Sequence, residues 1–176
     1  MPSLLVGTKG GLFELPLPRG GAVAASSDGG PVTALAARGS EVWTAFGGTT
    51  LHQRAPDGSW SAVAGVDERH AIASLLPDAP GLWVGTAGAR LLRLQGDGLA
   101  TVESFDRIDE RVDWYTPWGG PPDTRSLASG GGAVYVNVHV GGILRSADGG
   151  GTWRQTIDIH ADVHQVVAGP GGLVLA

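Results

Sequence analysis

Apolar residues recur along this chain in short runs that are separated by glycine turns. Four segments share one pattern, in which a β-branched or aromatic run precedes a glycine turn and a second apolar run; they begin at Leu4, Val42, Leu82 and Val134. A fifth copy, "LVLA", begins at Leu173. Apolar runs on both sides of a glycine turn predict β-hairpins. The starts lie 38, 40, 52 and 39 residues apart, so the hairpins belong to a repeat.

A further apolar strand precedes each later hairpin, in the segments "VTALAAR", "IASLLPD", "TRSLASG" and "VHQVVAG". Each segment holds one aligned apolar residue seven positions before the next hairpin start, namely Leu35, Leu75, Leu127 and Val166. A weaker strand follows the hairpin, most clearly in "GSWSAVA" and "GTWRQTI". The repeat unit therefore has four predicted strands and shows no helical periodicity.

A four-stranded unit of about 40 residues is typical of one blade of a β-propeller. A β-sandwich with strands every 8–12 residues is the alternative, and the fixed long-period register favours the propeller. We predict one all-β domain over residues 1–176, with about four blades. We expect an incomplete propeller that is part of a longer one; the alternative is closure as four blades, with the last strands pairing with the first hairpin.

Composition narrows the classes of function. Thirty glycines and eleven prolines disfavour helices. A net charge of −5 with scattered arginines argues against nucleic-acid binding. No apolar run reaches the roughly 18 residues needed to span a membrane. The chain has no cysteine and no secretion signal at its start, so we expect a cytoplasmic protein without membrane partners.

The stretch "SADGGGTW" lies between the third and fourth strands of its unit. An aspartate there can accept hydrogen bonds from backbone N–H groups, glycines permit positive φ, and the tryptophan can cover the neighbouring blade. The stretch lacks the alternating oxygen ligands of a calcium loop and the lysine and helix of a phosphate loop. We therefore interpret it as a structural turn built on Ser146, Asp148, Gly150, Thr152 and Trp153.

The 52-residue interval contains an insertion over about residues 106–122. It joins two blades, so it lies on the face opposite the "SADGGGTW" turn. It holds four carboxylates and the aromatic residues Trp114, Tyr115 and Trp118. Exposed rings beside carboxylates suit stacking on a sugar and bonding its hydroxyls. The alternative is that the rings cap the next blade.

The residues that begin the innermost strands are expected to surround the channel on that same face. In the last two units these positions are polar, which predicts a binding site at the channel mouth. The predicted ligand-binding residues combine the aromatic residues of the insertion with the polar residues of the channel mouth: Trp114, Tyr115, Trp118, Arg125, His139, Asp162, His164, Arg69 and His70.

Alternating acidic and histidine residues in "DIHADVHQV" raise the question of a metal site. Side chains on one face of a strand are about 6.8 Å apart, which is too far for all of them to bind one ion. His139, His160 and His164 would converge on zinc only if the chain turns there. We favour hydrogen-bonded histidines that line the channel, so we expect no metal and no cofactor.

The whole chain resembles the BNR/Asp-box propellers, the sialidase-like branch of WD40/YVTN/BNR-like repeats that are often labelled glycosyl hydrolase or exo-α-sialidase. The segments that carry the resemblance are "TKGGLF", "WYTPWGGPPDTR", "NVHVGGILRSADGGGTW" and "DVHQV". It implies a propeller whose ligand site lies opposite the Asp boxes. Sialidases also carry an F/Y-R-I-P motif and three substrate-binding arginines. The nearest string here, "FDRID", lacks the proline, and no third arginine is evident, so sialidase chemistry does not carry over.

Three functions remain open. The first is a non-catalytic scaffold that binds a carbohydrate, another small molecule or a protein. The second is a glycoside hydrolase with Asp113 and Asp123 as its carboxyl pair, which would have to stand about 5–5.5 Å apart in a retaining enzyme or about 6.5–9.5 Å apart in an inverting one. The third is an assembly-factor-like propeller that binds a protein through an exposed apolar patch.

Overall fold

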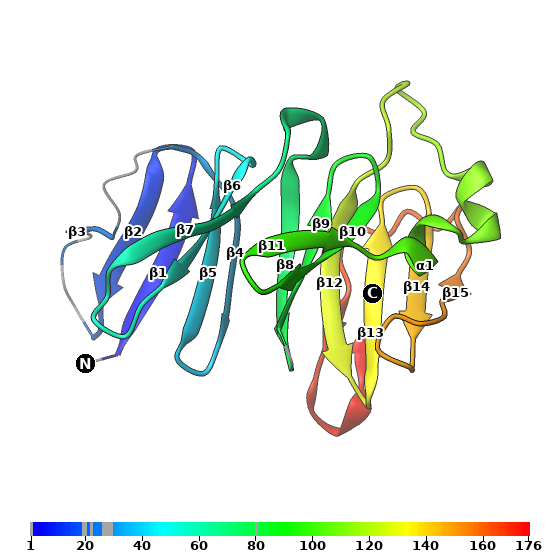
Figure 1. Cartoon of the computed structure of the whole chain (residues 1–176). Helices are drawn as coiled ribbons and strands as arrows, with labels where there is room; N and C mark the ends of the chain where they lie inside the picture. Colours follow the sequence, from blue (N-terminus) through cyan, green and yellow to red (C-terminus); the bar gives the residue numbers. More distant parts are fainter. Residues whose placement is uncertain (1, 19–20, 22, 26–29, 80) are drawn as a thin grey trace.

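The computed structural model describes residues 2–18, 21, 23–25, 30–79 and 81–176, and its regular structure is almost entirely β (Figure 1). The strands of the first half are β1 (Ser3–Thr8), β2 (Gly11–Pro16), β3 (Val23–Ala24), β4 (Val32–Arg38), β5 (Glu41–Phe46), β6 (Thr50–Arg54), β7 (Trp60–Gly65), β8 (Ile72–Asp78) and β9 (Gly81–Thr86). Those of the second half are β10 (Arg90–Gln95), β11 (Gly98–Thr101), β12 (Thr124–Gly130), β13 (Ala133–Val138), β14 (Gly142–Ser146), β15 (Arg154–Ile157), β16 (Val167–Ala168) and β17 (Val174–Leu175).

The predicted four-stranded unit is confirmed three times over. The strands pair as the antiparallel sheets β4-β5-β6-β7, β8-β9-β10-β11 and β12-β13-β14-β15, each in chain order. The strands β4, β8 and β12 coincide with the segments that precede the hairpins in the sequence. In each of these three strands the pairing with the next strand shifts by one residue at the second position. The same irregularity therefore recurs in every four-stranded sheet.

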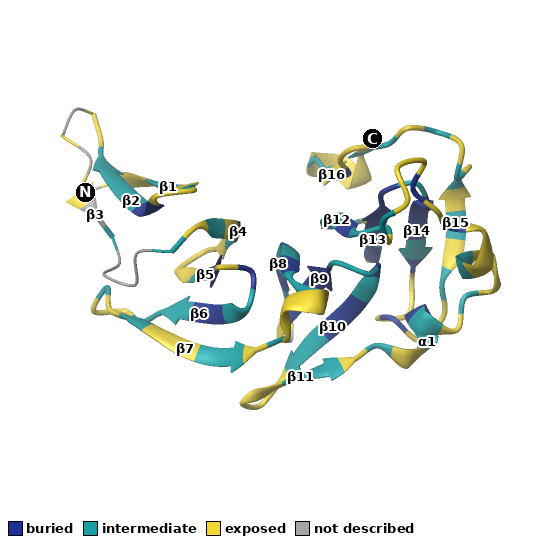
Figure 2. Cartoon of the chain, turned by 90° about the horizontal axis from the view of Figure 1, so that it is seen from above, coloured by how far each residue is buried: buried dark blue, intermediate teal, exposed yellow. Residues whose placement is uncertain are grey.

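The sheets follow one another along an arc, as Figure 2 shows from above. The innermost strands are neighbours around the concave side, where β1 packs on β4, β4 on β8, β8 on β12 and β12 on β16. The hairpins therefore stand radially, each sheet facing the next. This arrangement positions the ends of the innermost strands around a common axis.

The hydrophobic core lies between successive sheets. One cluster, which includes Trp43, Leu51 and Val84, fills the space between the β4–β7 and β8–β11 sheets. A second cluster, which includes Trp83 and Val136, joins the β8–β11 sheet to the β12–β15 sheet. The second strands of the three four-stranded sheets are largely buried because they are covered from both sides, and in β9 the five residues after Gly81 are all buried.

The two ends of the chain form smaller sheets, β1-β2-β3 and β16-β17. In the described part of the chain, β17 pairs with β16 and β1 pairs with β2, and the two small sheets lie at opposite ends of the arc (Figure 2). Closure as four blades, the alternative expected from the sequence, is therefore not the arrangement of this chain.

Short helices occur in the connections. They are α1 (Glu103–Asp106) and the 3-10 helices Glu68–His70, Asp109–Asp113 and Pro170–Gly172. A helix of three to five residues is too short to impose a 3.6-residue periodicity, so the sequence pattern did not reveal them. Within the described residues, no helix has the length and apolar character that crossing a membrane requires.

Candidate functional site

The loops between sheets and the turns between second and third strands meet at one end of the molecule, the rim face. The backbone N–H of His139, in the turn after β13, donates to the carbonyl of Asp123 just before β12 at 2.9 Å. The same bond joins Ala87 to Ala71 at 2.8 Å in the preceding sheet. The rim face consists of the turns 47–49, 87–89 and 139–141 and the loops 66–71, 107–123 and 158–166.

The Ser146–Trp153 turn lies at the opposite end, because β14 runs from Gly142 at the rim to Ser146. Asp148 accepts hydrogen bonds from the Thr152 hydroxyl at 2.6 Å, the Thr152 backbone N–H at 2.9 Å and the Ser146 hydroxyl at 2.7 Å. These bonds favour the carboxylate and hold the pKa of Asp148 far below its usual range. The side chain is thus engaged in closing its own turn.

This turn also docks its sheet on the neighbouring one. The Trp153 ring meets Trp83 of β9 and Phe105 of α1 edge-on, with centroid distances of 6.2 Å and 5.2 Å. Its indole N–H donates to the hydroxyl of Ser104 at 3.2 Å. These contacts join the turn to the neighbouring sheet, and a purely structural role for the turn stays a prediction.

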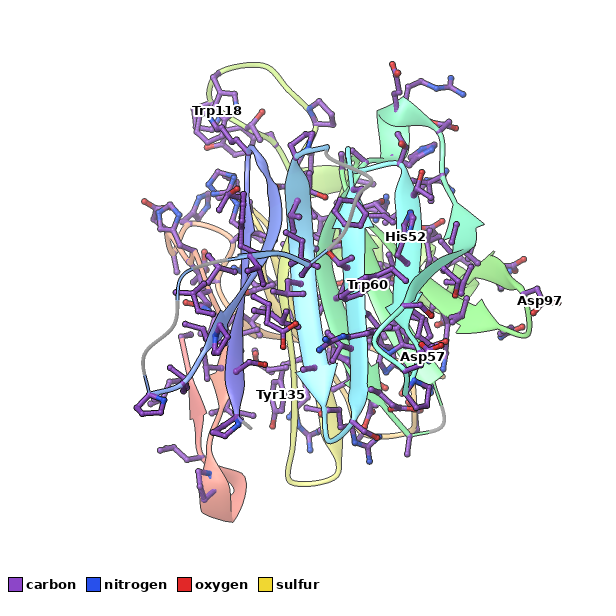
Figure 3. All side chains as sticks on the ribbon, turned by 90° about the vertical axis from the view of Figure 1, so that its left-hand side faces the viewer. His52, Asp57, Trp60, Asp97, Trp118 and Tyr135 are labelled. Atoms are coloured by element: carbon purple, nitrogen blue, oxygen red, sulfur yellow. The ribbon has the colours of Figure 1, made fainter. Side chains whose placement is uncertain are left out.

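The insertion is anchored at its base and exposed at its tip. Trp114, one of the predicted ligand-binding rings, is buried in the core against Phe105. The Arg111 guanidinium lies over the Trp114 ring at 5.1 Å and donates to the carbonyl of Ala89 at 2.7 Å. Trp118, by contrast, is 68% exposed, and Figure 3 shows it at the tip of the loop. The insertion therefore both caps a sheet and presents aromatic surface.

Five of the predicted polar residues gather at the rim, on the innermost strand β12 and the segments beside it. The guanidinium of Arg125 lies 3.4 Å from a carboxylate oxygen of Asp123 and 3.4 Å from Nδ1 of His164. His164 Nε2 lies 3.2 Å from a carboxylate oxygen of Asp162. His139 Nδ1 lies 3.7 Å from the other oxygen of Asp123. One network thus links two carboxylates, two imidazoles and a guanidinium.

The buried member of this network is His139. It is 4% exposed, and its ring stacks between Trp118, at 5.1 Å, and His164, at 5.6 Å. Burial, and next the charge of Arg125, lower the pKa of His139 below its ordinary value of 6.5. The next residue, Val140, has φ of +57°, a left-handed conformation that is strained for a β-branched side chain. The turn is therefore held in a costly shape that fixes the position of His139.

Two hydrogen bonds hold the 158–166 loop in place. Asn137, which is fully buried in β13, donates to the carbonyl of Val163 at 3.1 Å. The Ser126 hydroxyl accepts from the backbone N–H of Val166 at 2.8 Å. Neither residue was predicted from the sequence, although a buried asparagine in an apolar strand, "VYVNV", is a signal for such a positioning role.

A hollow of about 230 Å³ opens beside the network. Its wall combines aromatic, apolar and titratable side chains: Tyr115, Pro117, Trp118, His139, Val140, Ile159, His160, Ala161 and Asp162. Larger hollows lie elsewhere, one of about 380 Å³ at the opposite end, one of about 450 Å³ between β1 and β4 and one of about 330 Å³ beside β12 and β16. None of these three combines aromatic rings with titratable side chains, so the rim pocket is the candidate ligand site.

The other predicted residues lie outside this group. Arg69 and His70 face Asp67 in the preceding rim loop, where Asp67 accepts from the Arg69 backbone at 2.9 Å. Asp113 is exposed at the end of its 3-10 helix, whereas Asp123 is engaged by Arg125 and His139. These contacts do not pair the two carboxyl groups, and their catalytic role stays a prediction.

Comparison with known proteins identifies the fold. No protein-family model and no curated protein matches the chain. Among solved structures, a catalytically inactive virginiamycin B lyase from Staphylococcus aureus, bound to quinupristin, matches with a TM-score of 0.66 at 13% identity, over 94% of this chain and 55% of that one. YCF48 bound to D1 peptide matches with a TM-score of 0.60 at 13% identity, over 96% and 56%.

The extracellular domain of a putative one-component system, BT4673 from B. thetaiotaomicron, matches with a TM-score of 0.70 at 15% identity, over 98% of this chain and 24% of that one. These proteins are β-propellers, so the chain has a β-propeller fold and represents part of such a ring. It spans about half the length of two of them and about a quarter of the third. At these identities the likeness shows the fold alone.

Proposed function

We propose that this β-propeller chain is a binding scaffold and that its rim pocket holds a small polar ligand, with a carbohydrate as the favoured class. The observation that carries the proposal is the meeting of exposed Tyr115 and Trp118 with the Asp123–Arg125–His139–Asp162–His164 network. Flat rings supply contact area to a sugar ring, and the charged and imidazole groups can bond its hydroxyls. Behind them, the 158–166 loop is hydrogen-bonded to β12 and β13.

We also propose that the Ser146–Trp153 turn is an Asp box in the BNR sense. In support, Asp57 in the related stretch "PDGSW" accepts from the Ser59 hydroxyl at 2.7 Å and the Ser59 backbone at 2.9 Å. The carboxylate thus closes the turn between third and fourth strands in two sheets. The proposal includes membership of the sialidase-like repeat family. This membership does not imply that the chain catalyses a reaction.

Thermal unfolding with a panel of sugars tests the binding proposal. N-acetylneuraminic acid, N-acetylglucosamine, glucose and maltotriose would each be added in the presence of EDTA. We expect at least one of them to raise the midpoint, because a ligand at a hundredfold excess over its Kd stabilises the folded state by about 2.7 kcal/mol. A flat response to the whole panel would contradict the carbohydrate class.

Matched aromatic variants locate the effect. Trp118→Ala is expected to abolish the shift, since it removes the exposed ring at the pocket. Trp60→Ala, on the outer strand β7, removes a tryptophan away from the rim and should leave the shift intact (Figure 3). A shift that survives Trp118→Ala would place the ligand elsewhere.

A protein partner is the second candidate. Val112 is 88% exposed and lies on the same insertion as Trp118 and Tyr115, and exposed apolar groups in one place mark interaction surfaces. The YCF48 structure holds a peptide on the same fold. A pull-down would compare the Val112→Ser and Trp118→Ala variants. Loss of the partner in Val112→Ser would favour this candidate over a pocket ligand, whereas loss in Trp118→Ala alone would not.

A further inference from the structure

Three potential metal ligands converge at the mouth of the rim pocket. His139, Asp162 and His164 each offer one ligand atom, and these atoms all lie within 4.8 Å of one another. They come from the turn after β13 and from the 158–166 loop, which are joined through β12 and β13. We propose that these three residues bind one divalent transition-metal ion, with zinc as the reference ion.

The triad combines one fixed ligand with two that can adjust. His139 is buried and held by the strained turn at Val140, so its ring position is set. The side chains of His164 and Asp162 are 64% and 78% exposed, and rotation can bring both closer to the ion. Neighbouring ligands around tetrahedral zinc stand about 3.3 Å apart, given metal–ligand bonds of about 2.0–2.1 Å. The required contraction is therefore within the reach of two mobile side chains.

A carboxylate stands behind the buried ligand. Asp123 lies 3.7 Å from Nδ1 of His139, which is longer than a hydrogen bond, and Nε2 is the ring nitrogen left for a metal ion. A shift of a few tenths of an ångström on metal binding would let Asp123 accept the Nδ1 proton. A carboxylate that receives the second ring N–H of a metal-binding histidine fixes its tautomer and raises its basicity. Strand spacing alone argued against a metal site, and the set that the sequence offered if the chain turns there held His160 in place of Asp162.

The ligand chemistry points to zinc-type ions and away from magnesium. Two imidazoles with one carboxylate suit zinc, iron(II) or copper(II), whereas Mg²⁺ requires an oxygen-rich octahedron. Three protein ligands also leave coordination positions open, and the rim pocket lies on that side. The proposal goes beyond the binding function above, because a metal can bind whether or not a sugar does.

Arg125 competes with the metal ion. Its guanidinium lies 3.4 Å from Nδ1 of His164, so it donates to a lone pair there and leaves the proton on Nε2. If His164 binds the metal through Nε2, its ring proton moves to Nδ1 and the hydrogen bond from Arg125 to Nδ1 is lost. Arg125 then keeps its contact with Asp123 alone. Removal of the guanidinium also removes a positive charge next to a divalent ion. We expect Arg125→Gln to tighten zinc binding by about tenfold, from Coulomb repulsion over a few ångströms in water.

Calorimetric titration of the full chain with ZnCl2, without sugar, is the test. We expect one zinc per chain, no response to MgCl2, and a loss of at least about a hundredfold in affinity for His164→Gln, since loss of outer-shell partners alone costs 10–100-fold. His139→Gln is expected to behave alike. His164→Gln carries the test if the buried variant fails to fold, because His164 is exposed.

The matched control is His160→Gln, which removes a histidine that lines the same pocket and lies outside the triad. It should bind zinc as the wild type does. Absence of zinc binding in the folded wild type, full binding in His164→Gln, or equal loss in His160→Gln would each overturn the proposal. The sugar panel is measured in EDTA, so failure of the zinc site and failure of the sugar site are separate results.

Discussion

Replacement of Gly150 by alanine tests how closely the Ser146–Trp153 turn packs on the neighbouring sheet. Gly150 has φ of +95°, and a Cβ added there would lie 2.7 Å from Cη2 of Trp83. Gly149, one residue earlier, has φ of +70° and no atom within 4 Å of an added Cβ. The two glycines therefore share the left-handed backbone and differ in the space beside them.

The magnitudes follow from these two differences. A left-handed residue other than glycine costs about 1–2 kcal/mol, and both variants incur that cost. Overpacking against a buried ring costs about 1–3 kcal/mol more, and only Gly150→Ala incurs it. We expect Gly149→Ala to lower the free energy of unfolding by about 1–2 kcal/mol and Gly150→Ala by about 2–5 kcal/mol.

Urea denaturation, followed by tryptophan fluorescence and circular dichroism, measures both losses. The double variant Gly150→Ala/Trp83→Leu separates the clash from the backbone cost, because contacting residues couple by about 0.5–3 kcal/mol. Leucine at position 83 should recover part of the loss caused by Gly150→Ala. Equal losses for the two glycine variants, or no coupling to Trp83, would refute the packing described for this turn.

Three further perturbations have defined outcomes. Val140→Asn is expected to raise the free energy of unfolding by about 1 kcal/mol, because asparagine tolerates the left-handed conformation that strains valine; a less stable variant in urea would count against strain at this turn. Arg111→Ala should cost about 2–3 kcal/mol in the same assay through the lost bonds to Ala89 and Gly88, and a neutral result would mean that the insertion is anchored otherwise. Asp148→Asn should destabilise at neutral pH. The lowered pKa of Asp148 gives stability that is present above its ordinary value of 3.8 and is lost as the pH falls through the folded value, so the difference from wild type should shrink in acid; a difference that grows would contradict the sign.

The repeat was predictable because a radial sheet forces the same burial pattern on each unit. Strand β12 coincides with the segment "TRSLASG", and the glycine turn after β13 falls where the hairpin pattern puts it. The end strands were less predictable. "VHQVVAG" yields only the two-residue strand β16, because the residues before it follow the irregular 158–166 loop.

The site was predictable in part. The sequence grouped Arg125 and His164 in one predicted site at the channel mouth, and the structure brings them within 3.4 Å. The burial of Trp114 could not be predicted from the sequence. Which of the three aromatic rings of the insertion is buried depends on how α1 and Phe105 pack beneath it. The strain at Val140 likewise depends on backbone geometry that valine itself disfavours, so no local sequence rule predicts it.

The central claim is that the rim face, and not the opposite end, is the binding face. Two-dimensional NMR of the labelled chain, titrated with the same four sugars in EDTA, tests it most directly. The account predicts shifts of the Trp118 indole and of the Val140 and Ala161 amides, which surround the pocket. Shifts confined to Ser129 and Gly130, beside the hollow at the opposite end, would contradict it.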